Sequence, residues 1–490
     1  MNQMKRKLKN IPLVLVLACM LVLNQSHAPP KQRTPNIILI FMDDLGYGDL
    51  SCYGADGIHT PNIDKLAAEG IRFTNFMSAQ AVCSASRAAL MTGSYPNRVG
   101  ISGALSPNST VGLAREEMTI AELLKQKNYA TGIFGKWHLG DAKEFLPLQQ
   151  GFDEYLGIPY SNDMWPVDYD GAPARKGSNK LQYPPLPLIK NDRPIKIISS
   201  LDDQAKLTEL ITNEAIGFIK RNKHKPFFAY IPHPMPHVPI NASPAFIGNS
   251  KRGLFGDVIQ EVDYHVGRIM KTLKEEGLEE NTLVIFTSDN GPWLNFGDHA
   301  GSTGGLREGK GTSFEGGQRE PCIMRWKGIV PAGIVSNQLV STIDILPTLA
   351  TLVEVPLPER KIDGVDISSV LKGDLHITPR KTFLYYYRRN SLEAVRRDNW
   401  KLVFEHRGRS YLGQRPGVGG FPGNAPEDVL FPEALYNLEV DPTESHDVSG
   451  YHPEIVSALR LLAEEARKEL GDDLQKSPGS GRRGPGELTK

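Results

Sequence analysis

A cysteine and an arginine four residues apart, Cys83 and Arg87, are the first residues whose types and spacing suit chemistry. The small polar residues between them, the helix-forming run that follows and the stop at Gly93 predict a short helix that begins near Cys83. In such a helix the two side chains share one face, and the helix start favours an anion. Taken alone, the pattern more often describes a small buried cysteine and a surface arginine.

Two groups of oxygen-bearing side chains come directly after apolar runs of strand length. Asp43 and Asp44 follow one run, and Asp289 and Asn290 follow another. If the two strands are neighbours, three carboxylates and an amide carbonyl converge, an all-oxygen set suited to Ca²⁺, or to Mg²⁺ when waters complete it. Each group alone more often fits ordinary turn residues at a strand end.

A lysine and a histidine follow a third apolar run, in the segment Gly135-Lys136-Trp137-His138-Leu139-Gly140. In extended chain, residues two apart point the same way, so Lys136 and His138 would face one site. The lysine supplies a fixed charge, and the histidine can move a proton near neutral pH. Taken alone, a lysine and a histidine at this spacing are more often ordinary surface residues.

Two further segments carry candidate side chains. A proline-rich stretch over residues 230–239 holds His233 and His237 in stiff, extended chain, although a structural role is the safer interpretation for either alone. The glycine-rich loop 304–317 carries Lys310 and would let backbone approach an anion closely. It lacks the spacing of a nucleotide-binding P-loop and by itself resembles a flexible surface loop.

The elements that must position these residues alternate between strands and helices, which predicts an α/β fold with a large, mainly parallel sheet flanked by helices. Ligands in such sheets lie beyond the carboxyl ends of the strands, where most of the polar groups fall. The predicted strands cover residues 37–42, 131–134, 227–231 and 283–287. The predicted helices cover residues 62–69, 119–127, 202–221 and 258–276.

From about residue 376 the pattern changes to alternating strands, at 382–387 and 393–404, and a helix at 453–470. This predicts a smaller α+β C-terminal domain over residues 376–475, after a catalytic domain over 35–375. Segments 155–194 and 408–426 are rich in Gly and Pro and are predicted to be long loops. Residues 476–490 are predicted to be a disordered tail.

The first residues predict export. Basic residues precede the apolar run 11–23, and Ser26-His27-Ala28 offers a cleavage site, so residues 1–28 fit a signal peptide of a periplasmic or secreted protein. Cys19 lies in a lipoprotein-like context, which makes lipid anchoring the less favoured alternative. The run is too short for a stable transmembrane span.

The charge balance and the cysteine count add two constraints. The chain of 490 residues carries 56 basic and 56 acidic side chains, so nothing predicts a nucleic-acid partner. Removal of the signal leaves three cysteines, Cys52, Cys83 and Cys322, and an odd number in an oxidising compartment hints at a special role for one of them.

Together these stretches resemble the type I sulfatase family, the formylglycine-dependent, arylsulfatase A-like enzymes of the alkaline-phosphatase-like superfamily. Cys83-Ser84-Ala85-Ser86-Arg87 is similar to the family signature Cys-x-Pro/Ala-x-Arg, continued by Leu90-Met91-Thr92-Gly93. Residues 129–140 are similar to the second signature. Position 85 is Ala where the commonest form has Pro, which bears on how efficiently Cys83 is matured.

The resemblance implies an exported sulfatase that hydrolyses a sulfate ester of a small molecule or glycan after a maturase has converted Cys83 to formylglycine (3-oxoalanine). The hydrated aldehyde would be the nucleophile, steadied by Arg87, with His138 as the base and His237 as the proton donor to the leaving oxygen. Ca²⁺ would be held by Asp43, Asp44, residue 83, Asp289 and Asn290. Sulfate would be bound by Lys136, Lys310 and Ser161.

Two alternatives stay open at this point. A phosphodiesterase or phosphonate hydrolase of the same superfamily would use a similar site, because phosphate and sulfate are similar anions. An inactive glycan-binding homologue with an unconverted Cys83 would keep the fold without the reaction.

Overall fold

Strand β1 (Asn36–Met42) packs into two separate cores. Alternate side chains, represented by Leu39 and Ile40, point to opposite faces and are fully buried. A strand buried on both faces is typical of a parallel sheet covered by helices on both sides. The computed structural model describes residues 34–488, so the predicted signal peptide and Cys19 lie outside the described residues.

Within the described residues, one sheet runs in the order β11-β2-β10-β9-β1-β8-β4-β5-β6-β7, with β12 beside β2. The central strands β9, β1, β8, β4 and β5 are parallel, whereas β10 and β6 run antiparallel to both their neighbours. The sheet is therefore mixed, and the predicted parallel order holds at its centre. The bounds of the other strands are β2 (Ile71–Met77), β4 (Ala130–Phe134), β5 (Glu154–Gly157), β6 (Leu186–Lys190), β7 (Arg193–Ile198), β8 (Phe227–Pro232), β9 (Thr282–Ser288), β10 (Arg319–Arg325), β11 (Ile334–Ser336) and β12 (Val340–Ser341).

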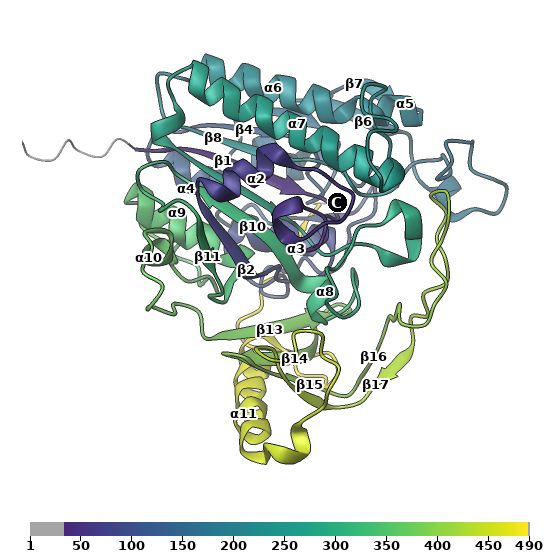
Figure 1. The fold of residues 1–490 in the computed structure, drawn as a ribbon, viewed down its shortest axis with the longest axis vertical. Helices are drawn as coiled ribbons and strands as arrows, with labels where there is room; N and C mark the ends of the chain where they lie inside the picture. Colours follow the sequence, from purple (N-terminus) through teal and green to yellow (C-terminus); the bar gives the residue numbers. More distant parts are fainter. Residues whose placement is uncertain (1–33, 489–490) are drawn as a thin grey trace, which may run out of the picture. The chain divides into compact units, whose positions relative to one another are not determined.

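Helices cover both faces of this sheet, as an α/β fold requires (Figure 1). One core is closed by α2 (Pro61–Ala68), α6 (Leu207–Arg221) and α7 (Gly253–Glu275). The other is closed by α3 (Cys83–Thr92), α4 (Ile120–Lys125), α9 (Ile345–Val353) and α10 (Ser368–Leu371). The helix predicted over residues 202–221 is in fact two, α5 (Leu201–Ala205) and α6. The α/β class with flanking helices is confirmed.

A separate strand-rich region follows. Strands β13 (Thr382–Tyr387), β14 (Ser391–Arg397), β15 (Trp400–Val403) and β18 (Ala434–Asn437) form an antiparallel sheet covered by α11 (Pro453–Leu470). The single strand predicted over residues 393–404 is a hairpin, β14 and β15. A small ribbon of β16 (His406–Gly408) and β17 (Val429–Phe431) flanks the loop predicted at 408–426. The domain boundary placed at residue 376 stays a prediction.

Two segments differ from the predicted loops. Strand β6 and the start of β7 lie within 155–194 and extend the main sheet, leaving a loop only over about 158–185. The expected disorder of 476–490 is not what the described part shows, because β19 (Gly486–Glu487) pairs with β3 (Val111–Gly112). Arg483 also forms an ion pair with Glu117 at 2.6 Å. These contacts join residues far apart in sequence, so local composition gave no sign of them.

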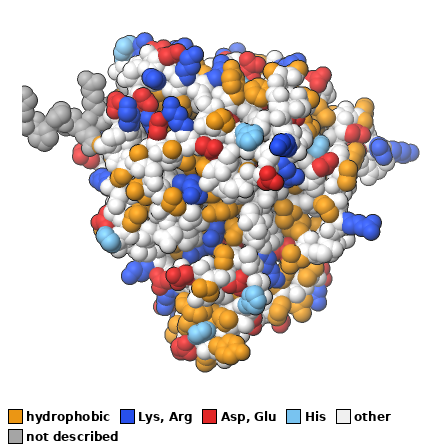
Figure 2. All heavy atoms as spheres, viewed as in Figure 1, with side chains coloured by type: hydrophobic (Ala, Val, Ile, Leu, Met, Phe, Trp, Pro, Cys, Tyr) orange, Lys and Arg blue, Asp and Glu red, His pale blue; other side chains and the backbone are white. Residues whose placement is uncertain are grey.

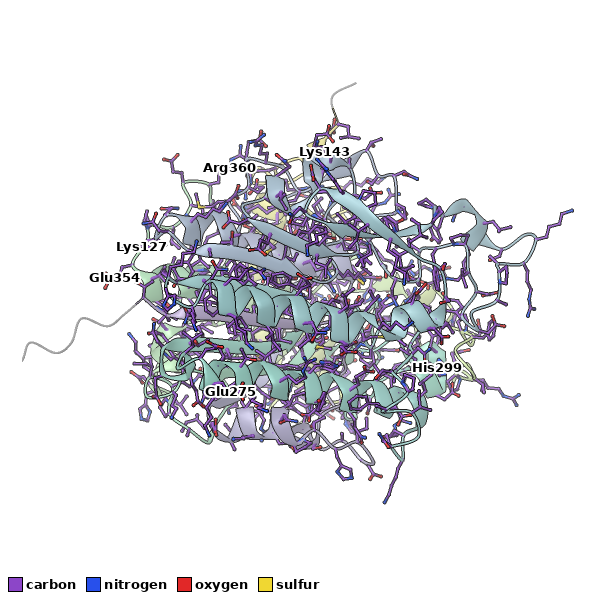
Figure 3. All side chains as sticks on the ribbon, turned by 90° about the horizontal axis from the view of Figure 1, so that it is seen from above. Lys127, Lys143, Glu275, His299, Glu354 and Arg360 are labelled. Atoms are coloured by element: carbon purple, nitrogen blue, oxygen red, sulfur yellow. The ribbon has the colours of Figure 1, made fainter. Side chains whose placement is uncertain are left out.

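Within residues 34–488, no helix has the length and apolar character that a membrane crossing requires. Basic and acidic side chains are interspersed over the face seen in Figure 2, as the even charge balance predicts. In the view from above, Lys127, which precedes β4, and His299, which follows β9, lie at opposite ends of the sheet (Figure 3).

Candidate active site

The predicted polar groups meet beyond the carboxyl ends of four adjacent strands, β9, β1, β8 and β4. Strands β1 and β9 are parallel neighbours, with Met42 opposite Ser288, so the aspartates that follow lie side by side. The backbone amide of Asp44 donates to Asp289 Oδ1 at 3.1 Å, and Asn290 Nδ2 donates to Asp44 Oδ1 at 2.7 Å. The structure therefore brings the two predicted acidic groups together.

Three buried cations surround the three carboxylates. Arg87 Nη2 lies 2.8 Å from Asp289 Oδ2 and 3.5 Å from Asp43 Oδ1. Lys136 Nζ lies 2.5 Å from Asp43 Oδ2. Burial alone would raise the pKa of Asp43, but Lys136 and the other nearby cationic groups hold it well below its ordinary value. Asp43 is therefore ionised although it is fully buried.

Lys310 completes this arrangement from the glycine-rich loop. Its Nζ donates to both carboxylate oxygens of Asp44, at 2.7 and 2.9 Å, and lies 3.4 Å from Cys83 Sγ. The three lysine and arginine charges balance the three carboxylates, so an anionic substrate would add uncompensated negative charge. A divalent cation would reverse that sign.

Cys83 occupies the first position of α3, at the positive end of the helix, and Gly93 ends the helix in a left-handed conformation (φ 65°), as predicted. The thiol is 2% exposed. Burial raises its pKa to about 12, outweighing the opposite influence of Lys136 and Lys310. The thiolate is the reactive form of cysteine, so the encoded thiol is a poor nucleophile here.

The buried side chains of the site could hold a cation. Asp43, Asp44, Cys83 and His237 each offer an atom, and these atoms all lie within 4.8 Å of one another. Among the described residues, the buried Oδ1 atoms of Asp43 and Asn290 have no hydrogen-bond partner. Carboxylate and amide oxygens are the ligands that Ca²⁺ and Mg²⁺ prefer. The unpaired oxygens are accounted for if a cation binds them.

His138 is held in one tautomer. Its backbone has φ 62° and donates to Pro159 O at 3.1 Å, while ring Nε2 lies 2.9 Å from the carbonyl oxygen of Leu105. A carbonyl can only accept, so Nε2 carries the proton and Nδ1, unpaired among the described residues, keeps its lone pair. Burial, followed by Lys136, lowers the pKa of His138 well below its ordinary value. The ring is a neutral base.

His237 lies on the other side of the carboxylates. Its Nδ1 lies 2.6 Å from Val238 O, which directs Nε2 towards Asp44 Oδ2 at 3.6 Å. Burial and then Lys310 lower its pKa, which makes the protonated ring a stronger acid. Ser161 joins the site as well, because its Oγ accepts a hydrogen bond from Lys136 Nζ at 3.0 Å.

Ten of the eleven predicted site residues are joined by hydrogen bonds, ion pairs or close contacts, and the eleventh, His138, is linked through Leu105 to Ser84 in the first turn of α3, whereas His233 does not join this network. His233 is fully buried, and both of its ring nitrogens are unpaired among the described residues. Burial lowers its pKa to about 3, with a further contribution from His265 of α7. A structural role stays the prediction for this histidine.

Two residues of the site were missed from the sequence. Asn162 Nδ2 donates to His237 O at 3.1 Å and fixes the histidine segment, but nothing local distinguishes it. Trp293 packs on His237 with ring centroids 5.6 Å apart, and Lys310 Nζ lies 4.6 Å from the Trp293 ring centroid. Its position three residues after Asn290 was a usable signal, because side chains just after a strand end face the same site.

Comparisons with known proteins agree with this geometry. The family model described as "Sulfatase" matches residues 35–355, and "C-terminal region of aryl-sulfatase" matches residues 379–480. Arylsulfatase A of Homo sapiens is 39% identical over 88% of this chain and 87% of its own length. N-acetylgalactosamine-6-sulfatase of Sus scrofa is 38% identical over 88% and 84%. The crystal structure of the PsFucS1 sulfatase from Pseudoalteromonas sp. superposes with a TM-score of 0.80 at 30% identity, covering 93% of both chains.

Proposed function

Because the chain belongs to the sulfatase family and is a sulfuric ester hydrolase, we propose that it releases sulfate through a formylglycine at position 83 and a Ca²⁺ ion. The observation that carries this proposal is the state of Cys83. Its thiol is buried beside Lys310, in a cluster of three cations and three carboxylates, and burial raises its pKa to about 12, which disfavours attack by a thiolate. A divalent cation would make this cluster suitable for an anionic sulfate ester. Hydration of a formylglycine supplies a hydroxyl nucleophile, and Ca²⁺ held by Asp43, Asp44, residue 83, Asp289 and Asn290 supplies a Lewis acid.

The sulfate oxygens would be bound by two lysines, Lys136 from the segment after β4 and Lys310 from the glycine-rich loop. Ser161 adds a hydroxyl beside Lys136. Arg87 pairs with Asp289 and donates to the Lys136 carbonyl at 3.0 Å, so it orients both the helix that carries residue 83 and the loop that carries the lysine. Fixed positive charge of this kind stabilises the charge that develops on sulfate oxygens.

The two histidines divide the proton transfers. Nδ1 of His138 has a free lone pair and takes a proton at residue 83. Nε2 of His237 would give a proton to the departing alcohol oxygen. Burial and then Lys310 lower the pKa of His237, so its protonated ring is a stronger acid, and Asp44 only partly offsets this shift. A departing alkoxide is a poor leaving group, so this donation matters most for sugar sulfates.

The substrate and partners follow from the same family. The similarity to N-acetylgalactosamine-6-sulfatase supports a sulfated glycan or small molecule as the substrate. The reaction would require a maturase that oxidises Cys83, and the predicted signal at residues 1–28 supports action outside the cytoplasm.

The test is the mass of the peptide that contains residue 83, measured on active enzyme. We expect sulfur to be replaced by oxygen with loss of two hydrogens, and we expect Cys83→Ala to abolish sulfate release from 4-nitrophenyl sulfate while a circular dichroism spectrum stays unchanged. Full activity in protein that contains only the thiol would overturn the proposal.

A further inference from the structure

Trp293 and Arg409 extend the site on the side of His237. The Trp293 ring contacts His237 and Lys310, as described above, and the Arg409 guanidinium carbon lies 6.0 Å from its centroid. His237 donates its proton to the alcohol oxygen, so the side chains next to it face the leaving group rather than the sulfate. Neither Trp293 nor Arg409 has a role in the proposed sulfate release.

Arg409 is fixed against the backbone of the catalytic lysine. Its Nη1 lies 3.5 Å from Lys310 O and donates to Tyr411 Oη at 3.2 Å, and Tyr411 Oη donates to Lys310 O at 2.5 Å. A Cβ at Gly311 would lie 2.8 Å from Arg409 Nη1, so the glycine makes room for the guanidinium. This arrangement holds the Arg409 guanidinium beside the backbone of Lys310, the proposed sulfate-binding lysine.

Arg409 shares its acidic partner with a second arginine. Its Nε donates to Glu427 Oε1 at 2.6 Å and its Nη2 lies 2.5 Å from the same oxygen, and the Glu427 carboxylate also accepts from Arg388 Nη2 at 3.2 Å. Two guanidinium groups therefore share one carboxylate. The Glu427 side chain is 56% exposed, whereas that of Arg409 is 18% exposed. Because Glu427 is exposed to water and shared by two guanidinium groups, an incoming anion can compete with it for Arg409.

Trp293 contributes a second free group. Its half-buried side chain has a buried indole Nε1 that has no hydrogen-bond partner among the described residues. A buried donor left unpaired is costly, and a ligand oxygen would satisfy it. An aromatic face with adjacent donors is suited to a sugar ring, which has an apolar face and oxygen-rich edges.

We propose that Trp293 and Arg409 form the leaving-group subsite and that it selects sugars with a second anionic group besides the scissile sulfate. The ring packs on the sugar, and the guanidinium binds a carboxylate or a second sulfate through charge-assisted hydrogen bonds. This inference rests on the proposed sulfate release, and it adds the chemical class of the substrate.

The experiment compares kcat/KM for three hexose 6-sulfates: one neutral elsewhere, one with a second sulfate and one linked to a uronic acid. For the wild type we expect the doubly anionic sugars to be favoured. Arg409→Ala should reduce that preference about tenfold, the size of one charge-assisted bond, and Arg409→Lys should restore part of it. The matched control is Arg407→Ala, because Arg407 lies two residues away on β16 and pairs with Asp428, not with the site.

The outcomes separate this inference from the proposed function. Equal preference in the wild type and Arg409→Ala, or an equal loss in Arg407→Ala, overturns the subsite, and the two doubly anionic sugars show whether carboxylate or sulfate is preferred. If no ester releases sulfate, the proposed function fails instead. In that case, calorimetry measures the affinity of the same three sugars for the wild type and for Arg409→Ala. A preference for the doubly anionic sugars that is lost in Arg409→Ala would support the subsite without turnover.

Discussion

The backbone amide of Ala85 donates to Gly103 O at 3.1 Å, a bond that proline at this position cannot make. The amide of Leu105 donates to Ser84 Oγ at 3.0 Å, so the first turn of α3 fixes the loop 103–105. The carbonyl of Leu105 in turn orients His138. The alanine that departs from the commonest signature therefore links the turn that carries residue 83 to His138, the proposed base.

At this scale the role of His237 is open to a direct test. If His237 protonates the leaving oxygen, His237→Gln should slow sugar sulfates about 10²–10⁴-fold and slow 4-nitrophenyl sulfate much less, because nitrophenolate leaves without a proton. The measurement is kcat/KM across leaving groups of different pKa. His233→Gln is the control, since His233 lies in the same segment outside the network, and it should leave the dependence on leaving-group pKa unchanged. Equal losses for all esters would contradict the assignment.

Among the elements, the last described strand is tied to the loop that carries His138. Strand β19 pairs with β3, and Leu113, directly after β3, donates its amide to Leu139 O at 2.9 Å. Arg483 holds the segment through two hydrogen bonds to Glu117, at 2.6 and 2.8 Å. The side chain of Glu117 is only 3% exposed, so these bonds are shielded from solvent.

Arg483→Ala should therefore lower the free energy of unfolding by about 1–3 kcal/mol, because it removes charged hydrogen bonds from a buried carboxylate. It should also lower kcat through the His138 loop. Urea unfolding and initial rates measure the two effects. Arg482→Ala is the matched control, because Arg482 Nη1 donates to Pro478 O at 3.3 Å and Arg482 pairs with no carboxylate among residues 34–488. Unchanged stability and rate in Arg483→Ala would show that the segment is not needed.

The strands also show which parts of the fold and of the candidate site can be predicted from the sequence. The apolar runs that end in Asp43 and Asp289 predict buried strands, and the shared edge of a parallel sheet brings their carboxylates together. Strands β6 and β7 were missed because their sequence, LPLIK and RPIKII, is short and interrupted by proline. Arg409 lies about 100 residues beyond Lys310, directly after β16, and no local pattern relates the two.

For the molecule as a whole, a buried neutral histidine makes stability depend on pH. His233 has its pKa lowered to about 3 by burial, whereas an unfolded histidine titrates near 6.5. Between these values the unfolded chain binds a proton that the folded chain does not, so stability falls as the pH falls through this range. Asp49 has a pKa raised to about 7 by burial and acts in the opposite direction, so only a difference between variants isolates His233.

From pH 7 to pH 5, the wild type should therefore lose about 2 kcal/mol more unfolding free energy than His233→Gln. Urea unfolding at the two pH values measures this difference. His446→Gln should behave like the wild type, because the His446 side chain is 83% exposed. Parallel losses in the wild type and His233→Gln would show that this histidine is protonated in the folded protein.

The burial of Cys83 depends on residues that are synthesised much later than Cys83 itself. The groups that enclose it, Asp289, Asn290 and Lys310, lie about 200 residues later in the chain. A ribosome that adds roughly 5–20 residues per second needs roughly 10–40 s to reach them. If a maturase modifies residue 83 as proposed, it could reach the residue during that interval but not after the strands have paired. The speed of synthesis, rather than the finished surface, would then set the fraction of molecules that become active.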